Sequence, residues 1–227
     1  MKIKNATIMP QKKRATTTLR HLKIAYPKSK IALKFGNNIQ LLVAVILSAQ
    51  CTDKKVNEVT EKIFSTKGGS ASGGKKYWSV EDFANAKQGV LEREIHSTGF
   101  FRAKAKNIIG AARMIQNDFG GELPRTMLEM IHIPGVARKT ANIVLGNAYG
   151  VVEGIAVDTH VKRFARVCGF SDSDNPVKIE QDLMKLFPKK EWLTLTYRII
   201  DHGRDSRKKE HKHEPCALRD ICGDPKF

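Results

Sequence analysis

Apolar residues recur at helical spacing along most of the chain. Three sets lie at positions i, i+3, i+4 and i+7, the pattern of one buried face of an amphipathic helix. These sets are Ala105, Ile108, Ile109 and Ala112; Ala141, Val144, Leu145 and Ala148; and Val161, Phe164, Ala165 and Cys168. The segment Ile39–Ala49 is apolar on nearly all sides and predicts a central, enclosed helix. Val43–Leu47 alone would also suit a buried strand, but no alternating partner strand exists, so the pattern favours an all-α protein.

Polar residues and glycines mark the expected helix ends. Thr52 or Asp53 suits the start of a helix over Lys54–Phe64, and Asp158 suits the start of a helix over His160–Cys168. Glycine favours the left-handed conformation in which many helices end. The glycines at expected helix ends are Gly120, Gly121, Gly150 and Gly169.

The chain has 227 residues and a formal net charge of +17, and the positive charge is unevenly distributed. Residues 1–34 contain ten lysines and arginines and no aspartate or glutamate. Such a segment attracts polyanions with a steep salt dependence, which favours nucleic acid as the partner. A solubilising tail and a membrane surface are the alternatives, although no strongly amphipathic helix supports a membrane contact.

The composition conflicts with several protein classes. The longest apolar run, Leu41–Ala49, is about half of the ~20 residues that a bilayer span needs, and no apolar signal core follows a charged start. Four cysteines in a chain of this length favour a reducing compartment over a disulfide scaffold. We therefore expect a soluble, cytoplasmic protein without a membrane partner. The Gly/Ser-rich segment Gly68–Gly74 matches no phosphate-binding fingerprint and is expected to form a mobile loop.

One segment has the pattern of a helix-hairpin-helix. A short helix over Met127–Ile131 is expected to end before the turn Pro134-Gly135, and a second helix follows within about two residues. The N–H groups of the turn and of the second helix's first turn, together with the helix dipole, form an anion site. Gly135 lets another backbone approach closely, so a DNA phosphate is a natural ligand. An ordinary corner between two helices is the structural alternative.

Lys139 and Asp158 are the candidate catalytic residues. At 100° per residue, Lys139 lies roughly 160° from the apolar stripe of its helix and projects away from the core. Its amine would be a nucleophile if Arg138 and partial desolvation lower its pKa, whereas a solvated lysine is the alternative. Asp158 suits a helix cap, where its carboxylate stays ionised and is available for proton transfer or for stabilising a cation. His160, in the same first turn, is a structural histidine or a phosphate contact.

Several motifs together resemble the endonuclease III branch of the helix-hairpin-helix DNA glycosylase superfamily. The hairpin segment IPGVARKTANIVLGNAYG is followed by VDTHVKR, which carries the downstream aspartate. The segments LLVAVILSAQCTD, STGFFRAKAKNI and DHGR also match in order and spacing. The resemblance covers roughly Thr16–Cys222, nearly the whole chain.

The resemblance implies an all-α fold of two helical lobes with a DNA-binding cleft between them. One lobe is expected over residues 31–150, and the other over residues 1–30 and 151–227. The implied activity is a bifunctional DNA glycosylase and abasic-site lyase, which excises oxidised pyrimidines through a lysine Schiff base and β-elimination. The expected partner is double-stranded DNA with a damaged base or an abasic site, bound by a monomer near the nucleoid.

The resemblance also assigns roles to individual residues. Lys139 would attack C1′ of the flipped nucleotide, and Asp158 would accept a proton or stabilise the sugar cation. Gln50 would fill the hole in the duplex, and Phe100 would be a wedge on the opposite strand, although both Phe100 and Phe101 also suit a core. The remaining DNA contacts are expected from the hairpin and its surroundings. They are Gly135, Ala137, Arg138, Thr140 and His160, with Lys104 and Lys106 as further phosphate contacts.

The C-terminal tail departs from the family pattern. The family usually ends with four cysteines spaced C-x6-C-x2-C-x5-C that bind a 4Fe–4S cluster, but only Cys216 and Cys222 match here. Ser206 and His213 occupy the first and second ligand positions. Because cubane clusters require four thiolates, we expect no cofactor. Zinc held by His211 or His213 with Cys216 and Cys222 is a weak alternative.

Two other functions are compatible with these motifs. The incomplete cysteine pattern would suit a noncatalytic DNA-binding protein, and the fold would also suit a uracil or thymine mismatch glycosylase. A lysine at position 139 argues against the related adenine-specific mismatch glycosylases, which lack the amine there. A smaller departure is Ala137, which stands where the hairpin often has glycine; its N–H is kept, and no positive φ is expected.

Overall fold

A computed structural model describes residues 10–64 and 77–206 of the chain. Within these ranges the regular secondary structure is helical, apart from one isolated bridge between Phe64 and Tyr77, and the predicted all-α class is confirmed. The segment Gly68–Gly74, for which we expected a mobile loop, lies outside the described residues, as do positions 1–9 and 207–227. No helix in the described ranges has the length and apolar character that crossing a membrane requires.

The chain divides into two compact units. One unit is continuous and runs from Ile31 to Glu153, and the other combines Met1–Lys30 with Gly154–Phe227. The helices of the continuous unit are α2 (Asn38–Leu47), α3 (Asp53–Ile63), α4 (Val80–Ala84), α5 (Gln88–Ile95), the 3₁₀ turn η2 (His96–Thr98), α6 (Phe101–Asp118), α7 (Met127–Met130) and α8 (Arg138–Tyr149).

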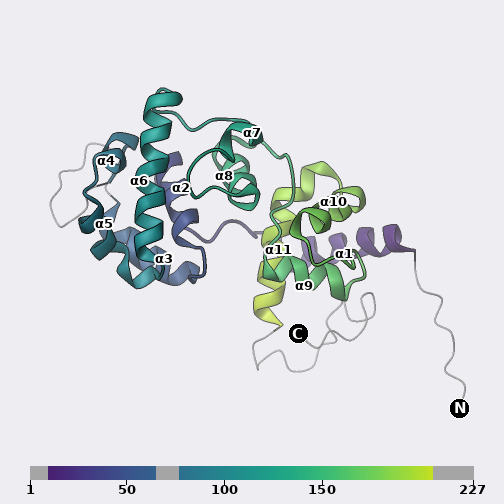
Figure 1. Ribbon diagram of the computed structural model, residues 1–227. Helices are drawn as coiled ribbons and strands as arrows, with labels where there is room; N and C mark the ends of the chain where they lie inside the picture. Colours follow the sequence, from purple (N-terminus) through teal and green to yellow (C-terminus); the bar gives the residue numbers. More distant parts are fainter. Residues whose placement is uncertain (1–9, 65–76, 207–227) are drawn as a thin grey trace, which may run out of the picture. The chain divides into compact units, whose positions relative to one another are not determined.

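The continuous unit is built around α2 and α6. Every residue from Ile39 to Leu47 is buried, so α2 is the predicted central helix, and the alternative of a strand over Val43–Leu47 is wrong. Asn37 caps α2 by accepting a hydrogen bond from the N–H of Gln40, and the helix ends at Leu47 rather than at Ala49. The long helix α6 contacts α2, α4 and α5, as Figure 1 shows, while α8 packs on α2 and α7.

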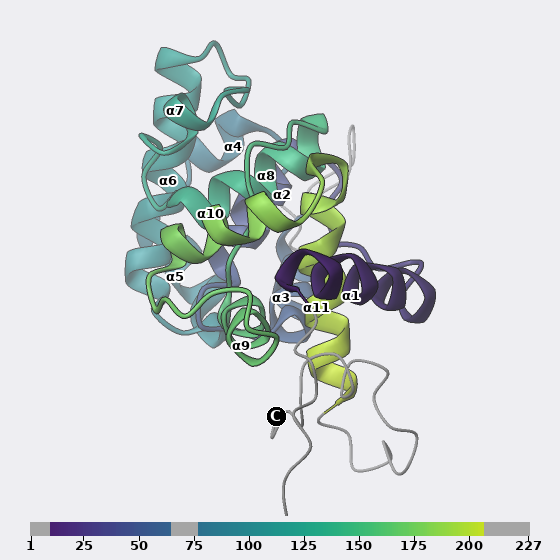
Figure 2. The same ribbon diagram turned by 90° about the vertical axis from the view of Figure 1, so that its right-hand side faces the viewer.

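The second unit contains the remaining described helices. They are α1 (Gln11–Ala25), α9 (Thr159–Val167), α10 (Pro176–Leu186), the 3₁₀ turn η3 (Lys189–Glu191) and α11 (Trp192–Asp205). Helix α11 contacts both α1 and α9 (Figure 2), so the ends of the chain's described part lie in one unit. Buried Glu191 joins α1 to α11, because it accepts hydrogen bonds from Lys23 and Arg198, each at 2.7 Å.

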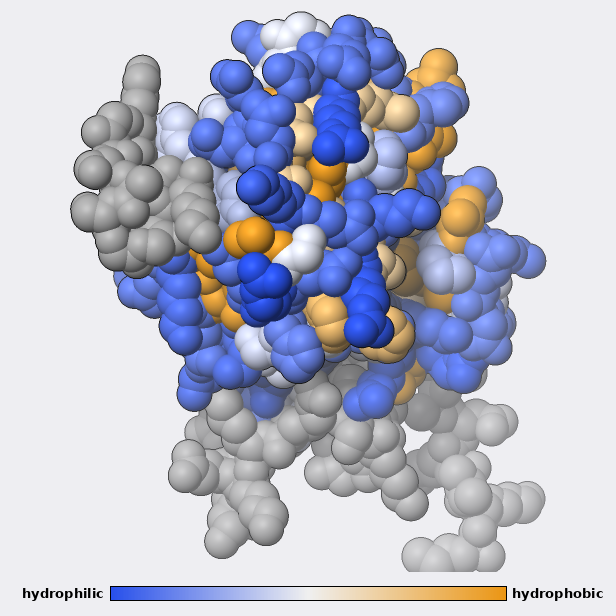
Figure 3. Space-filling view, turned by 60° about the vertical axis from the view of Figure 1, so that its left-hand side comes forward, coloured by the Kyte–Doolittle hydropathy of each residue, from blue (hydrophilic) through white to orange (hydrophobic). Residues whose placement is uncertain are grey.

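The predicted helix ends are largely confirmed. Thr52 caps α3 and Asp158 caps α9, while Gly150 and Gly169 have φ of 67° and 63° directly after or near the ends of α8 and α9. The predicted helices 54–64 and 160–168 each begin and end one residue earlier in the structure. On the face in Figure 3, hydrophilic residues predominate and hydrophobic residues form small separate patches, as expected when the apolar helix faces pack inward.

Candidate functional site

The helix-hairpin-helix is present in the continuous unit. Helix α7 ends at Met130, α8 begins at Arg138, and a turn over residues 131–137 joins them. Ile133 and Val136 are buried, and the N–H of Val136 donates to the carbonyl of Ile133 at 3.0 Å. These two apolar side chains anchor the turn. Gly135 and Ala137 are exposed.

The turn is seated on α6. Gly135 has φ of 78°, and a Cβ atom added to it would lie 2.8 Å from Cβ of Asn107. A Cβ atom on Gly110 of α6 would lie 3.4 Å from the Pro134 ring, which places the proline directly against α6. Gly135 is therefore required both for its left-handed backbone and for its close approach to α6. The sequence indicated a close approach at Gly135, but to the backbone of a ligand; neither its left-handed backbone nor its contact with Asn107 was predicted.

The first turn of α8 carries the predicted hairpin contacts. Ala137 precedes the helix with φ of −89° and ψ of 168°, so no glycine is needed there, as predicted. Its methyl side chain cannot cap the helix, which leaves the first N–H groups of α8 without a side-chain acceptor from this position. Lys139 is exposed, which confirms that it projects away from the core, and Arg138 and Thr140 beside it are partly exposed.

Asp158 and His160 lie in the second unit, at the start of α9. Oδ1 of Asp158 accepts the N–H of Val161 at 2.8 Å, which is the predicted capping contact. The carboxylate is half-buried. His160 lies against Gly203 of the DHGR segment, where an added Cβ atom would be only 2.6 Å from Nδ1 of the imidazole. This packing supports the structural interpretation of His160 and explains why α11 has a glycine in its last turns.

Gln50 lies at the corner between α2 and α3. Its side chain is exposed, and its φ of 53° is in the left-handed region that residues other than glycine rarely adopt. The N–H of Cys51 donates to the carbonyl of Ser48 at 3.1 Å and closes a turn around Gln50. The backbone thus directs the Gln50 amide away from the core.

Phe100 and Phe101 have different surroundings, which the sequence left open. The Phe100 side chain is 64% exposed and has φ of 48° immediately before α6. Phe101 packs against the core, and its ring centroid is 4.5 Å from that of His96. The exposed ring of Phe100 is available to contact a ligand, whereas Phe101 anchors the start of α6.

Lys104 is not a phosphate contact, contrary to our expectation. Its side chain is buried, and Nζ donates to the carbonyls of Leu47 and Thr98, each at 2.8 Å. A signal for this burial was present in the sequence, because Lys104 shares one helical face with Ile108, Ala111 and Ile115, which are all buried. Lys106, by contrast, is exposed and remains a candidate contact.

Of the tail residues at the four ligand positions, only Ser206 lies within the described part. Its hydroxyl donates to the carbonyl of His202 at 2.9 Å and closes the end of α11. A serine hydroxyl is not the thiolate that a cubane cluster requires. The other candidate ligands lie outside the described residues: His211, His213, Cys216 and Cys222. Within the described residues, no group of three or more His, Cys, Asp or Glu side chains could hold a metal ion.

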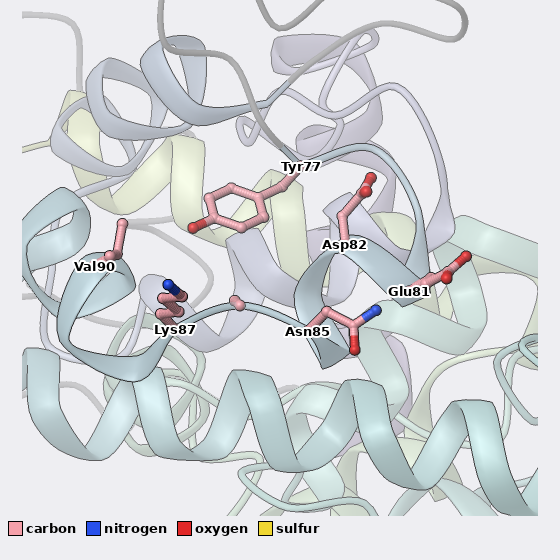
Figure 4. A pocket seen from close by; sticks show the side chains of 7 residues that line it. Tyr77, Glu81, Asp82, Asn85, Lys87 and Val90 are labelled. Atoms are coloured by element: carbon pink, nitrogen blue, oxygen red, sulfur yellow. The ribbon is translucent and has the colours of Figure 1, made fainter.

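A shallow hollow beside α4 and α5 contains none of the predicted site residues (Figure 4). It is lined by Tyr77, Glu81, Asp82, Asn85, Ala86, Lys87 and Val90. Two of its polar groups have local partners: the Tyr77 hydroxyl donates to Glu94 at 2.8 Å, and the Asp82 carboxylate accepts the N–H of Ser79 at 2.8 Å. Because these contacts stabilise the start of α4 and its packing, the hollow does not indicate a ligand site.

The chain matches a known protein family along most of its length. Residues 43–189 match the family model described as HhH-GPD superfamily base excision DNA repair protein. The chain is 47% identical to endonuclease III of Synechocystis sp. over 215 residues, which cover 94% of this chain and 90% of that protein. It is 39% identical to endonuclease III of Bacillus subtilis over 87% of this chain and 86% of that protein.

A solved structure shares the fold along nearly the whole chain. The structure of a trapped endonuclease III–DNA covalent intermediate superimposes with a TM-score of 0.84 at 36% sequence identity. The match covers 95% of this chain and 97% of that one.

Proposed function

Because the chain belongs to the endonuclease III family, we propose that it excises oxidised pyrimidines from duplex DNA and then cleaves the strand at the resulting abasic site. Lys139 is the nucleophile of this reaction. The observation that carries this assignment is an exposed lysine in the first turn of α8, immediately after the anchored hairpin. A lysine at this position reaches a bound sugar–phosphate chain without leaving its helix.

The proposed chemistry begins with the amine of Lys139 in its neutral form. Nζ attacks C1′ of the damaged nucleotide as the bond from C1′ to the base breaks, and the base leaves with a proton. The lone pair of Nζ then breaks the C1′–O4′ bond of the sugar ring, and O4′ takes up a proton. The product is a protonated Schiff base, an iminium between Nζ and C1′ that keeps the remaining N–H proton. The iminium acidifies the C2′–H bond, and loss of that proton expels the 3′ phosphate by β-elimination.

Asp158 is assigned the proton-transfer and charge-stabilising role. Its Oδ1 is held by the N–H of Val161, and the positive end of the α9 dipole favours the ionised carboxylate. Such a carboxylate is suited to accept a proton from the ammonium group of Lys139 and to stabilise a developing sugar cation. Lys139 is exposed in the free protein, so its desolvation would come from the bound DNA.

The DNA contacts divide into those that position the strand and those that fill the duplex. The N–H groups of the hairpin and of the first turn of α8 bind a phosphate, with Arg138 and Thr140 beside them. The target base must leave the stack before C1′ becomes accessible. Gln50 and Phe100 then enter the disturbed duplex. The exposed amide of Gln50 pairs with the orphaned base, and the exposed ring of Phe100 separates stacked bases.

We also infer that this chain does not bind the family's 4Fe–4S cluster. Two of its four ligand positions hold Ser206 and His213 in place of cysteine. A hydroxyl and an imidazole do not replace the two missing thiolates. The roles assigned to Lys139, Asp158 and the hairpin involve no metal.

Borohydride trapping tests the assignment of Lys139. Reduction of the wild-type protein with a duplex that contains an abasic site should give a covalent protein–DNA adduct, because borohydride reduces the Schiff base. Lys139→Ala should give no adduct and should lower the strand-cleavage rate by a factor on the order of 10³ or more, because it lacks the amine. Adduct formation is measured by denaturing gel electrophoresis.

The control is Lys62→Ala, which removes an exposed lysine of α3. It should trap DNA as the wild type does, and Lys139→Ala should retain DNA binding. Binding by the wild type without any adduct would support a noncatalytic DNA-binding protein or a monofunctional glycosylase. An adduct that persists in Lys139→Ala would contradict the choice of nucleophile.

A further inference from the structure

Lys104 is a buried cation whose hydrogen-bond acceptors are backbone carbonyls. Its side chain is 4% exposed, and burial lowers its pKa. No carboxylate among the described residues forms an ion pair with it. Instead, Nζ donates to the carbonyl of Leu47 at 2.8 Å and to the carbonyl of Thr98 at 2.8 Å. A buried charge is costly unless it is hydrogen-bonded, so both contacts are needed to keep the ammonium group in the core.

The two carbonyls terminate two different elements. Leu47 is the last residue of α2, and Thr98 is the last residue of η2. A cation at the end of a helix satisfies carbonyls that have no intrahelical partner and interacts favourably with the helix dipole. Through one Nζ atom, α6 therefore joins the ends of two segments that are about 50 residues apart in the chain.

Each of these ends leads directly to a residue with a strained backbone. Gln50 follows Leu47 by three positions and has φ of 53°, and Phe100 follows Thr98 by two positions and has φ of 48°. They are the two non-glycine residues with positive φ in the described part of the chain. Such conformations persist where the surrounding structure determines them, and Lys104 is the group that both turns share.

We propose that Lys104 is a positioning residue that holds the Gln50 turn and the Phe100 turn in a fixed relation, so that both side chains enter the damaged duplex together. This proposal rests on the function proposed above, which assigns Gln50 and Phe100 to the duplex. Lys104 itself touches no DNA. Its effect passes through the carbonyls of Leu47 and Thr98 to the two turns.

The test compares two substrates that differ in their need for the two turns. Excision of a damaged pyrimidine from a duplex requires Gln50 to fill the gap left by the flipped nucleotide and Phe100 to insert as a wedge on the opposite strand. Borohydride trapping on a single-stranded abasic oligonucleotide requires only the Lys139 chemistry. For Lys104→Met, we expect single-turnover excision from duplex DNA to fall at least about tenfold, while trapping on the single strand changes less than about twofold. Trapping on the single strand also counts the active molecules, so it corrects for a misfolded fraction.

Three variants serve as comparisons. Lys62→Met removes an exposed lysine of α3 in the same unit and should leave both reactions unchanged. Lys104→Arg keeps a cation and its donors and should recover most of the duplex activity. In a Phe100→Ala background, Lys104→Met should have a much smaller effect than in the wild type, because residues that act through one another are not additive.

Several results would overturn the proposal. One is an equal loss on both substrates, and another is duplex excision by Lys104→Met at the wild-type rate. A third is full additivity with Phe100→Ala, which would show that Lys104 only stabilises the fold. If Lys104→Met does not fold, Lys104→Gln, which lacks the charge and has a shorter reach, is judged by the same criteria. Failure of the proposed function is distinguishable, since the wild type would then give no adduct on either substrate.

Discussion

At the scale of single residues, the two surface residues that we assign to the duplex differ from their neighbours in backbone conformation. Gln50 and Phe100 both have left-handed backbones, although neither is a glycine. A left-handed conformation costs an L-residue with a side chain roughly 1–2 kcal/mol. The sequence predicted a role for each side chain, but it gave no sign of this strain, because the strain depends on the turns that the buried Lys104 holds.

Replacing Phe100 with glycine should therefore stabilise the continuous unit relative to replacing it with alanine. Both variants lack the exposed ring, but only glycine relieves the strained φ of 48°. We expect Phe100→Gly to have a free energy of unfolding about 1 kcal/mol higher than that of Phe100→Ala. Denaturant unfolding in a Trp192→Phe background, followed by the fluorescence of Trp78 in the same unit, measures the difference.

The excision activity of Phe100→Gly and Phe100→Ala is the second quantity to compare. Excision from duplex DNA should fall to a similar extent in both variants, because the ring is absent from both. A Phe100→Gly variant that is no more stable than Phe100→Ala would show that the backbone of this turn is not strained.

At the scale of elements, the structure explains two glycines by their neighbours on other helices. Gly135 approaches Asn107 of α6, and Gly203 of α11 approaches His160 of α9. The four helices whose bounds were predicted, over 39–49, 54–64, 127–131 and 160–168, lie within two residues of those bounds, because periodicity and caps are local properties of the sequence. The partners of these glycines could not be predicted, since Gly203 and His160 are brought together only when α9 and α11 pack.

Replacing Gly203 with alanine should reverse the usual effect of this substitution. In an unobstructed helix, Gly→Ala stabilises by about 1 kcal/mol. Here the new methyl group would lie 2.6 Å from Nδ1 of His160, so Gly203→Ala should destabilise the second unit by roughly 1–3 kcal/mol. In a His160→Ala background, the same substitution should instead stabilise the protein. Thermal unfolding of the four proteins tests this change of sign, and equal effects in both backgrounds would refute the predicted clash.

At the scale of the whole molecule, the all-α class and the family were predictable, because the hairpin, Lys139, Asp158 and the DHGR segment occur in register along the chain. The family resemblance led to a wrong assignment for Lys104, which we expected at a phosphate and which is buried. Its place just downstream of the expected wedge Phe100 suggested a phosphate, whereas its register with Ile108 and Ile115 indicated the core. Positional pattern was the better guide there, because burial depends on the helix face and not on residue type alone.

The number of cysteines in the whole chain leads to a prediction of its iron content. Two of the four cysteines, Cys216 and Cys222, occupy ligand positions of the family pattern, so the purified protein should contain far less than stoichiometric iron. A Ser206→Cys and His213→Cys double variant restores the spacing C-x6-C-x2-C-x5-C and should bind iron and absorb visible light after anaerobic reconstitution. Elemental analysis and absorbance spectra measure both. About four irons per wild-type chain would contradict the inference.

The bridge from Lys104 to Leu47 and Thr98 has a consequence for how the protein searches DNA. Because both turns are already ordered in the free molecule, an encounter with a base pair does not have to freeze two loops before the pair can be inspected. The entropy of ordering is lost once, when the chain folds, and not at each of the many undamaged sites it visits. Each base pair can therefore be inspected without a preceding step that orders the two turns.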